Sequence, residues 1–372
     1  MMFQFRLATG KDDAQLRSLM AATPVPGSVT VAFEREPDFF AACPTMGECL
    51  VVLATEEEEG SQRLAAAVSL ARQDRWWGNE PRPVGYVGGL RVHPDFRGAG
   101  ILTKAMPFIR DVASGWGDIP WFTVIPAGNR SSEGLFVRNI RASFPQLHLL
   151  CELFTLGLAT RQHGLDSALT RPAIDFTTQV HHASPEEVAG FLSEHPQELR
   201  PCWTAEDLRP GSGLGHLWLL GASRSGTLVG TAAVWDQEAF KQSVVRVYSP
   251  GLARLRPLYN LAARLAGIPV LPDPGQAIRS AYLSCFCVPG VDGQDGREVA
   301  SLLLRESIQL AGAMGKDYLM AGFAAGDPVL GLARKHRHVS YQSNLYSFIF
   351  AERESPLLPN EASSPSVEIG TL

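Results

Sequence analysis

The sequence has few cysteines and no long uninterrupted apolar run. Six cysteines among 372 residues are too few for a disulfide framework, and no two of them have the C-x-x-C spacing of a zinc or redox site. We therefore expect buried thiols in a reducing compartment. The longest stretch without Asp, Glu, Lys or Arg, residues 18–33, contains two prolines and is shorter than the roughly 20 apolar residues of a spanning helix. No membrane partner is expected.

Basic charge is scarce as well. Lys and Arg total 33 against 38 Asp and Glu, which gives a net charge of −5. No stretch forms the basic stripe of a duplex-binding protein, so we expect no nucleic-acid partner. The N-terminal segment Met-Met-Phe-Gln-Phe-Arg lacks the apolar core of a signal peptide, and we expect a cytoplasmic protein. A hydrophobic share of 45% excludes global disorder.

Strand-like and helix-like segments alternate along the chain, and their order repeats. The spacing of apolar residues predicts a strand over 84–93, a helix over 101–114 and a strand over 120–125. A helix broken by Pro37 is predicted over 33–42.

The interval from Val92 to Phe154 equals that from Val288 to Phe350, and both run through the same series of elements. The repeat predicts a first unit over 1–158, a linker over 159–175, a second unit over 176–352 and a flexible tail over 353–372.

The clearest chemical motif is G-L-R-V-H-P-D-F-R-G-A-G-I-L at residues 89–102. A strand ends at Val92-His93-Pro94, a loop of Arg97-Gly98-Ala99-Gly100 follows, and a helix begins at Ile101. Glycines allow successive backbone N–H groups to surround a phosphate without interference from a Cβ atom. The helix N-terminus adds unpaired donors and the positive end of its dipole, and Arg97 adds a cation. This pattern predicts a diphosphate site.

Two common nucleotide motifs fit this loop badly. A dinucleotide fingerprint needs a third glycine after Gly98-x-Gly100, and it follows the first strand of its domain. A mononucleotide P-loop needs Lys and then Ser or Thr after the second glycine, whereas Ile101 and Leu102 follow Gly100 here.

The segment resembles the acyl-CoA-binding motif of the GNAT superfamily of N-acetyltransferases. In that motif a V-x-P strand end precedes [QR]-x-x-G-x-[GA], which opens a helix. Residues 97–101 fit the pattern, whereas Leu102 stands where the family has Gly or Ala. The resemblance implies an α/β (α+β) fold of two GNAT-like domains, each a mixed, mostly antiparallel central sheet flanked by helices. The second domain would be a degenerate copy, because Asp292 and Asp295 place carboxylates where a diphosphate would lie.

The resemblance also implies the co-substrate and its contacts. Acetyl-CoA or another acyl-CoA would bind without a metal, its pantetheine arm pairing with one strand edge and its pyrophosphate held by the glycine loop. The implied cofactor-binding residues are Leu90, Arg91, Val92, Arg97, Gly98, Ala99, Gly100, Ile101, Leu102, Thr103 and Asn129. The family's usual proton-donating tyrosine lies seven positions after this asparagine, where Phe136 stands here.

Three residues are candidates for acid–base catalysis. Tyr86 shares a strand face with Leu90, and an ordinary cross-strand aromatic is the alternative reading. Glu34 would lie on the acceptor-side helix, or be solvated or paired with Arg35. Glu152 interrupts an apolar strand and either faces outward or enters the cleft.

The function that follows is direct attack of an amine on the thioester in a ternary complex. The acceptor would be a small molecule or a peptide, and a homodimer stays open. The alternative is a non-catalytic acyl-CoA-binding sensor or interaction protein, which the departures at Phe136 and Leu102 favour.

Overall fold

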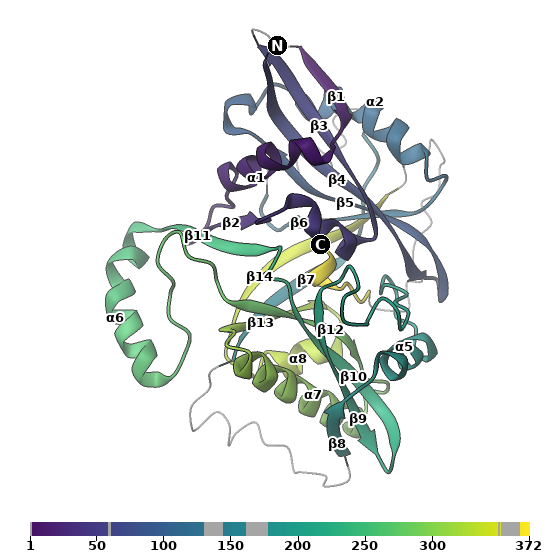
Figure 1. Cartoon of the computed structure of the whole chain (residues 1–372). Helices are drawn as coiled ribbons and strands as arrows, with labels where there is room; N and C mark the ends of the chain where they lie inside the picture. The colour runs from purple at the N-terminus through teal and green to yellow at the C-terminus, as the bar shows by residue number, and fades with distance from the viewer. Residues whose placement is uncertain (1, 59–60, 130–143, 161–177, 349, 351–364) are drawn as a thin grey trace.

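The computed structural model describes residues 2–58, 61–129, 144–160, 178–348, 350 and 365–372. Its centre is a 12-stranded sheet with the order β1-β3-β4-β5-β6-β14-β7-β13-β12-β10-β9-β8 (Figure 1). The strands are β1 (Phe3–Leu7), β3 (Glu48–Glu58), β4 (Ser61–Trp77), β5 (Glu80–Val92), β6 (Trp121–Pro126), β7 (His148–Ala159), β8 (Thr178–His182), β9 (His216–Arg224), β10 (Thr227–Asp236), β12 (Ser280–Cys287), β13 (Tyr318–Ala324) and β14 (His338–Phe348).

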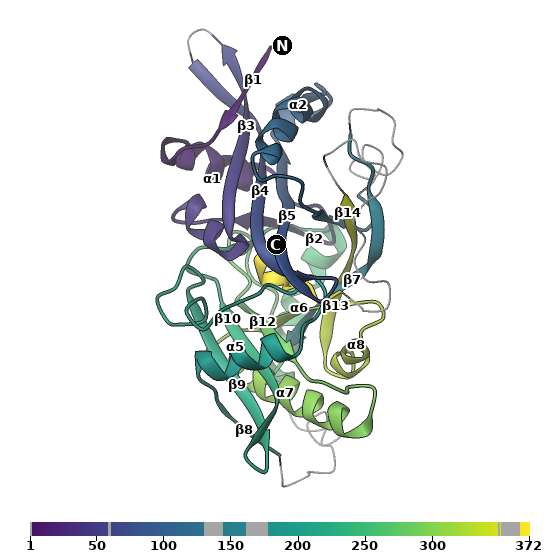
Figure 2. The same cartoon turned by 90° about the vertical axis from the view of Figure 1, so that its right-hand side faces the viewer.

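Within this sheet, β5 pairs with β6 and β12 with β13 in parallel, and the other neighbours are antiparallel. Helices cover both ends of the sheet (Figure 2). They are α1 (Asp13–Ala22), α2 (Ile101–Ser114), α5 (Pro185–Glu194), α7 (Gln294–Ala313) and α8 (Pro328–Ala333). A further helix, α6 (Pro250–Ala266), lies away from this sheet. The predicted mixed, mostly antiparallel sheet flanked by helices is confirmed.

The two halves exchange their last strands. β7, from the first half, pairs with β13, whereas β14, from the second half, lies between β6 and β7. The sheet is therefore continuous across the predicted division at 158 and 176. Those boundaries stay a prediction, and residues 161–175 of the predicted linker lie outside the described residues.

The repeat is visible in the backbone. In β5 the register with β4 shifts between Ala67 and Ser69, at Gly89, which has a φ of +64°. In β12 the register with β10 shifts between Thr231 and Ala233, at Cys285, which has a φ of +49°. Each half thus carries a bulge at the same point of the corresponding strand, just before the sheet opens.

Two expectations were wrong. The segment predicted as a helix over 33–42 instead ends a strand, β2 (Val29–Glu34), which pairs with β11 (Gln242–Tyr248), and a 3-10 helix, Phe39–Met46, follows. A strand partner from the distant half decides this local structure. The predicted flexible tail also fails for residues 365–372, since residues 367–371 are buried at the centre of the molecule. Residues 353–364 lie outside the described residues.

Candidate functional site

The opening of the sheet between β5 and β6 forms a cleft. The parallel pairing of these strands covers Gly85–Trp121 and Tyr86–Phe122, and the Thr123 hydroxyl donates to the Val87 carbonyl at 2.8 Å. The cleft, with a volume of about 600 Å³, is lined by residues 87–91 of β5, residues 123–129 of and after β6, and apolar side chains of α2.

The glycine loop lies at the start of α2, whose first-turn residue Leu102 lines this cleft. Gly98 and Gly100 have φ values of +83° and +68°, in the left-handed region, and a Cβ atom on either would meet no heavy atom within 4 Å. The first helical bond runs from the Lys104 N–H to the Gly100 carbonyl at 3.2 Å, which leaves the N–H groups of residues 101–103 without an acceptor inside the helix. Exposed donors at a helix N-terminus form an anion site.

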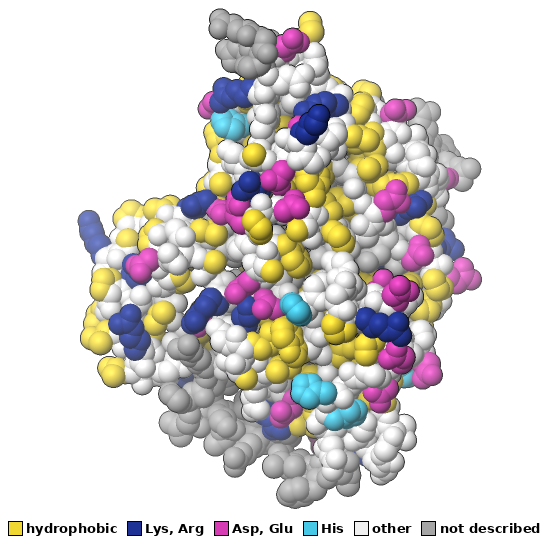
Figure 3. Space-filling model, viewed as in Figure 1, with side chains coloured by type: hydrophobic (Ala, Val, Ile, Leu, Met, Phe, Trp, Pro, Cys, Tyr) yellow, Lys and Arg dark blue, Asp and Glu magenta, His cyan; other side chains and the backbone are white. Residues whose placement is uncertain are grey.

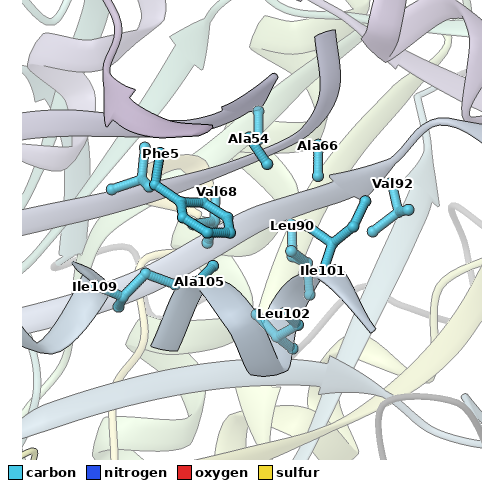
Figure 4. Close-up of a pocket in the computed structure, with 12 residues that line it drawn as sticks. Phe5, Ala54, Ala66, Val68, Leu90, Val92, Ile101, Leu102, Ala105 and Ile109 are labelled. Atoms are coloured by element: carbon cyan, nitrogen blue, oxygen red, sulfur yellow. The ribbon is translucent and has the colours of Figure 1, made fainter. Parts of the chain in front are cut away.

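Apolar packing fixes the direction of that helix. Ile101, Ala105 and Ile109 point from α2 toward β1, β3, β4 and β5, around a cavity of about 20 Å³ with an entirely apolar lining (Figure 4). A space of this size holds about one water molecule, and an apolar lining keeps it dry. The cavity is therefore packing that orients the glycine loop, and it has no room for a cofactor.

The family comparison agrees with this geometry. The acetyltransferase (GNAT) family model matches residues 16–139, which include β5, the glycine loop and α2. The stretch that this model matches, residues 16–139, is called the GNAT domain below. No curated protein matches the sequence.

Solved structures with the same fold match the chain over nearly its whole length. A GCN5-related N-acetyltransferase from Sphaerobacter thermophilus has 13% identity and a TM-score of 0.53, over 100% of this chain and 98% of that one. Saccharomyces cerevisiae N-myristoyltransferase with bound myristoyl-CoA has 12% identity and a TM-score of 0.58, over 98% of this chain and 87% of that one. The same enzyme with myristoyl-CoA and inhibitors has 11% identity and a TM-score of 0.61, over 100% and 86%. These likenesses extend the shared fold beyond the GNAT domain.

The predicted cofactor-binding residues divide by position. Leu90, Arg91, Leu102 and Asn129 line the cleft. Val92 and Ile101 line the small apolar cavity beneath α2, which Leu90 and Leu102 also reach (Figure 4). The loop residues Arg97, Gly98, Ala99 and Gly100 and the first-turn residue Thr103 lie at the surface, exposed or half-buried. The structure thus brings the glycine loop and the β5 edge to one side of the GNAT domain.

Tyr86 packs in the core and is not among the residues that line this cleft. Its ring stacks on Phe122 with centroids 4.9 Å apart, and burial raises the pKa of its phenol to about 12. The hydroxyl lies against Gly88, on the side where a Cβ atom would approach it to 2.3 Å. Gly88 lines the cleft, so the phenol lies one residue behind the cleft lining, 7% exposed.

The two glutamates lie apart from the cleft lining. Glu34 ends β2 and forms an ion pair with Arg246 of β11, so its partner comes from the other half of the chain rather than from Arg35. Glu152 is exposed on β7, opposite Asn344 of β14. Of the two orientations considered for Glu152, the structure shows the outward one. Phe136 lies outside the described residues.

The corresponding opening in the second half is filled by the chain itself. The Cys285 N–H, at the bulge of β12, donates to the Glu368 carboxylate at 2.9 Å, and the Ser284 hydroxyl donates to the same carboxylate at 2.8 Å. Ile369 packs against Gly322 of β13. Asp295, at the start of α7, forms an ion pair with Arg224 at 3.4 Å. Nothing in the Pro- and Ser-rich composition of the tail signals this insertion.

The sequence patterns also gave no sign of a buried lysine, Lys241, beside residues 365–372. The Lys241 ammonium donates to the main-chain oxygens of Gly370 and Leu372 at 3.3 and 2.6 Å. Burial, with a contribution from Arg35, lowers its pKa to about 7.

In the part of the chain that the structure describes, no group of three or more His, Cys, Asp or Glu side chains is placed to hold a metal ion, and no helix is long and apolar enough to cross a membrane.

Proposed function

We propose that the GNAT domain binds acetyl-CoA or another acyl-CoA and transfers the acyl group to an amine. One observation carries the proposal: Leu102, in the first turn of α2 directly after the left-handed glycine loop, and the bulged edge of β5 line the same cleft. A loop of this kind holds phosphates, and a strand edge freed by a bulge offers backbone donors and acceptors to an extended ligand.

The binding roles follow from these positions. The N–H groups of residues 98 and 100–103, with the Arg97 guanidinium, would hold the diphosphate, whereas the Ala99 N–H already donates to the Phe96 carbonyl at 3.2 Å. Leu90 and Arg91 would hydrogen-bond through their backbone to the pantetheine arm, and Asn129 would contact that arm from the opposite wall. Leu102 places a large side chain on the lining, where the family motif has a small one, so the arm would lie slightly farther from α2.

The proposed chemistry is direct attack of a neutral amine on the thioester carbonyl. The C–N bond forms, the C–S bond breaks, the amine loses one proton and the leaving thiolate gains one. Holding both reactants in one cleft supplies much of the rate acceleration. A backbone N–H at the Gly89 bulge would polarise the carbonyl oxygen, and the Cys285 N–H shows the same position donating to a carboxylate oxygen in the second half.

Tyr86 is the best-placed proton donor among the three candidates. A phenol with a pKa of about 12 stays protonated at neutral pH and can donate to a thiolate as that charge develops. This placement favours catalysis over the alternative of a silent acyl-CoA sensor. We further propose that residues 176–352 act as a structural copy, because residues 365–372 fill their opening.

The test is release of free CoA thiol from acetyl-CoA and from longer acyl-CoA species, each with a panel of amines. We expect amine-dependent thiol release together with an acylated amine. Saturable acyl-CoA binding without turnover on any amine would instead support the sensor. Comparison of kcat/KM among the donors assigns the preferred acyl chain length.

A further inference from the structure

The helix α6 projects from the side of the molecule on the β2–β11 arm, away from the large sheet (Figure 1). It is held mainly by the loop that follows it. The Asn260 side chain bonds to both backbone groups of Leu271, at 2.9 and 2.8 Å, and the Arg256 guanidinium donates to the Leu271 carbonyl and pairs with Asp273. Ala263 is the residue of α6 that this packing buries.

The opposite side of α6 is an exposed leucine face. Leu258, Leu261 and Leu265 are 68%, 57% and 81% exposed. Their spacing of three and four residues places them along one side of the helix, and Arg256, Asn260 and Ala263 lie on the other. Leu255, also exposed, extends the face toward the helix start. Side chains of this size so fully exposed along one helix mark an interaction surface.

The charge around this face is reversed relative to the rest of the chain. Residues 239–272 contain no Asp or Glu, whereas the whole protein has a net charge of −5. Arg256 and Arg246 are paired with carboxylates, and Lys241 is buried against main-chain oxygens. Arg254 and Arg264 remain exposed beside the leucine face. In Figure 3, the lobe at the left carries mostly hydrophobic, Lys and Arg side chains.

We propose that α6 docks this protein on the surface of an anionic lipid bilayer. A convex helix with leucines on one side and cationic flanks lies in the interface, with its apolar face among the acyl chains and its arginines at the head groups. A protein partner would more typically meet several aromatic anchors, whereas α6 has one aromatic residue, Tyr259, which is 38% exposed and less exposed than the leucines. The helix lies on the membrane rather than crossing it. This proposal replaces the expectation of no membrane partner.

The experiment is flotation of the full-length protein with vesicles of pure phosphatidylcholine or of phosphatidylcholine with phosphatidylglycerol. We expect binding to the anionic vesicles, at least tenfold weaker binding to neutral ones, and loss of binding as salt rises. Leu258→Ser with Leu265→Ser should reduce partitioning at least tenfold, and Arg254→Gln with Arg264→Gln by about fivefold for each arginine.

The matched control is Val339→Ser with Lys335→Gln, which changes an exposed apolar and an exposed basic side chain on the second half. It should bind vesicles like the unaltered protein. Circular dichroism and acyltransferase assays in solution should be unchanged in the α6 variants, which separates this proposal from the enzymatic one.

Absence of flotation with either vesicle overturns the proposal, as does flotation that the leucine variants do not reduce. A dimer in light scattering that the leucine variants dissociate would assign the face to a second copy instead.

Discussion

The backbone N–H of Cys285 donates to the side-chain carboxylate of Glu368 at 2.9 Å. Cys285 stands at the bulge of β12, the position that Gly89 occupies in β5. The same backbone donor therefore meets a carboxylate of the chain in one half and borders an open cleft in the other. This asymmetry supports the proposed assignment of ligand binding to the first half.

Glu368 should accordingly be a strong determinant of stability. Glu368→Ala leaves two buried donors, from Cys285 and Ser284, without an acceptor, and each such loss costs about 1–3 kcal/mol. We expect a decrease of about 2 kcal/mol or more in the free energy of unfolding, measured by urea denaturation. Glu206→Ala, at an exposed position, should change it by less than about 0.5 kcal/mol. Equal stabilities of the two variants would show that Glu368 does not fill the opening.

Gly100→Val should weaken CoA binding. Gly100 has a φ of +68°, a conformation that strains a β-branched residue, and the new side chain would extend into the space assigned to the diphosphate. Isothermal calorimetry should show at least a tenfold higher Kd for CoA. Gly117→Val is the control, because Gly117 has a φ of +79° and the same open surroundings at the far end of α2. A similar loss of affinity in both variants would attribute the effect to backbone strain alone.

Tyr86→Phe tests the proposed proton donor. Removal of the hydroxyl should lower kcat by about 100-fold, within the usual range for a general acid, with little change in the Kd for acyl-CoA. Tyr282→Phe is a matched control, since Tyr282 pairs with Met320 as Tyr86 pairs with Phe122 and is likewise a buried phenol with a raised pKa. An unchanged kcat in Tyr86→Phe would show that solvent or another group supplies the proton.

Asp12 should make stability depend on pH in the acid range. Its carboxylate accepts from the Arg6 guanidinium at 2.6 and 2.9 Å and from the Thr9 N–H at 2.8 Å, and these bonds lower its pKa from 3.8 to about 2. The folded state therefore favours the ionised form. That stabilisation is complete above pH 4 and is lost as the pH falls toward 2.

Asp12→Asn should therefore cost about 1–2 kcal/mol at pH 7, after allowance for the partly exposed Arg6. The difference from the unaltered protein should shrink as the pH falls from 4 to 2 in denaturation experiments. Asp111→Asn, at an exposed position on α2, is the control. A constant difference across this pH range would assign the effect of Asp12→Asn to packing.

Local patterns in the sequence predicted the elements around the glycine loop well. The helix expected over 101–114 is α2 with the same bounds, and the strand expected over 120–125 is β6 to within a residue. Apolar periodicity and left-handed glycines are local signals, so they can be read without knowledge of the fold.

Features that depend on the pairing of segments far apart in the chain could not be predicted from the sequence. Glu34 meets Arg246, 212 positions away, and this pairing turns an expected helix into a strand. The exchange of β7 and β14 and the insertion of residues 365–372 likewise depend on which strands meet in the folded chain. Tertiary contacts override local propensity at such sites.

The most direct test of the ligand assignment is a crystal structure of the full chain with CoA. We expect the diphosphate against the N–H groups of residues 98 and 100–103, the pantetheine arm along Leu90 and Arg91, and residues 365–372 still filling the opening in the second half. Diphosphate density beside Asp295, or a glycine loop without ligand at saturating CoA, would contradict the assignment.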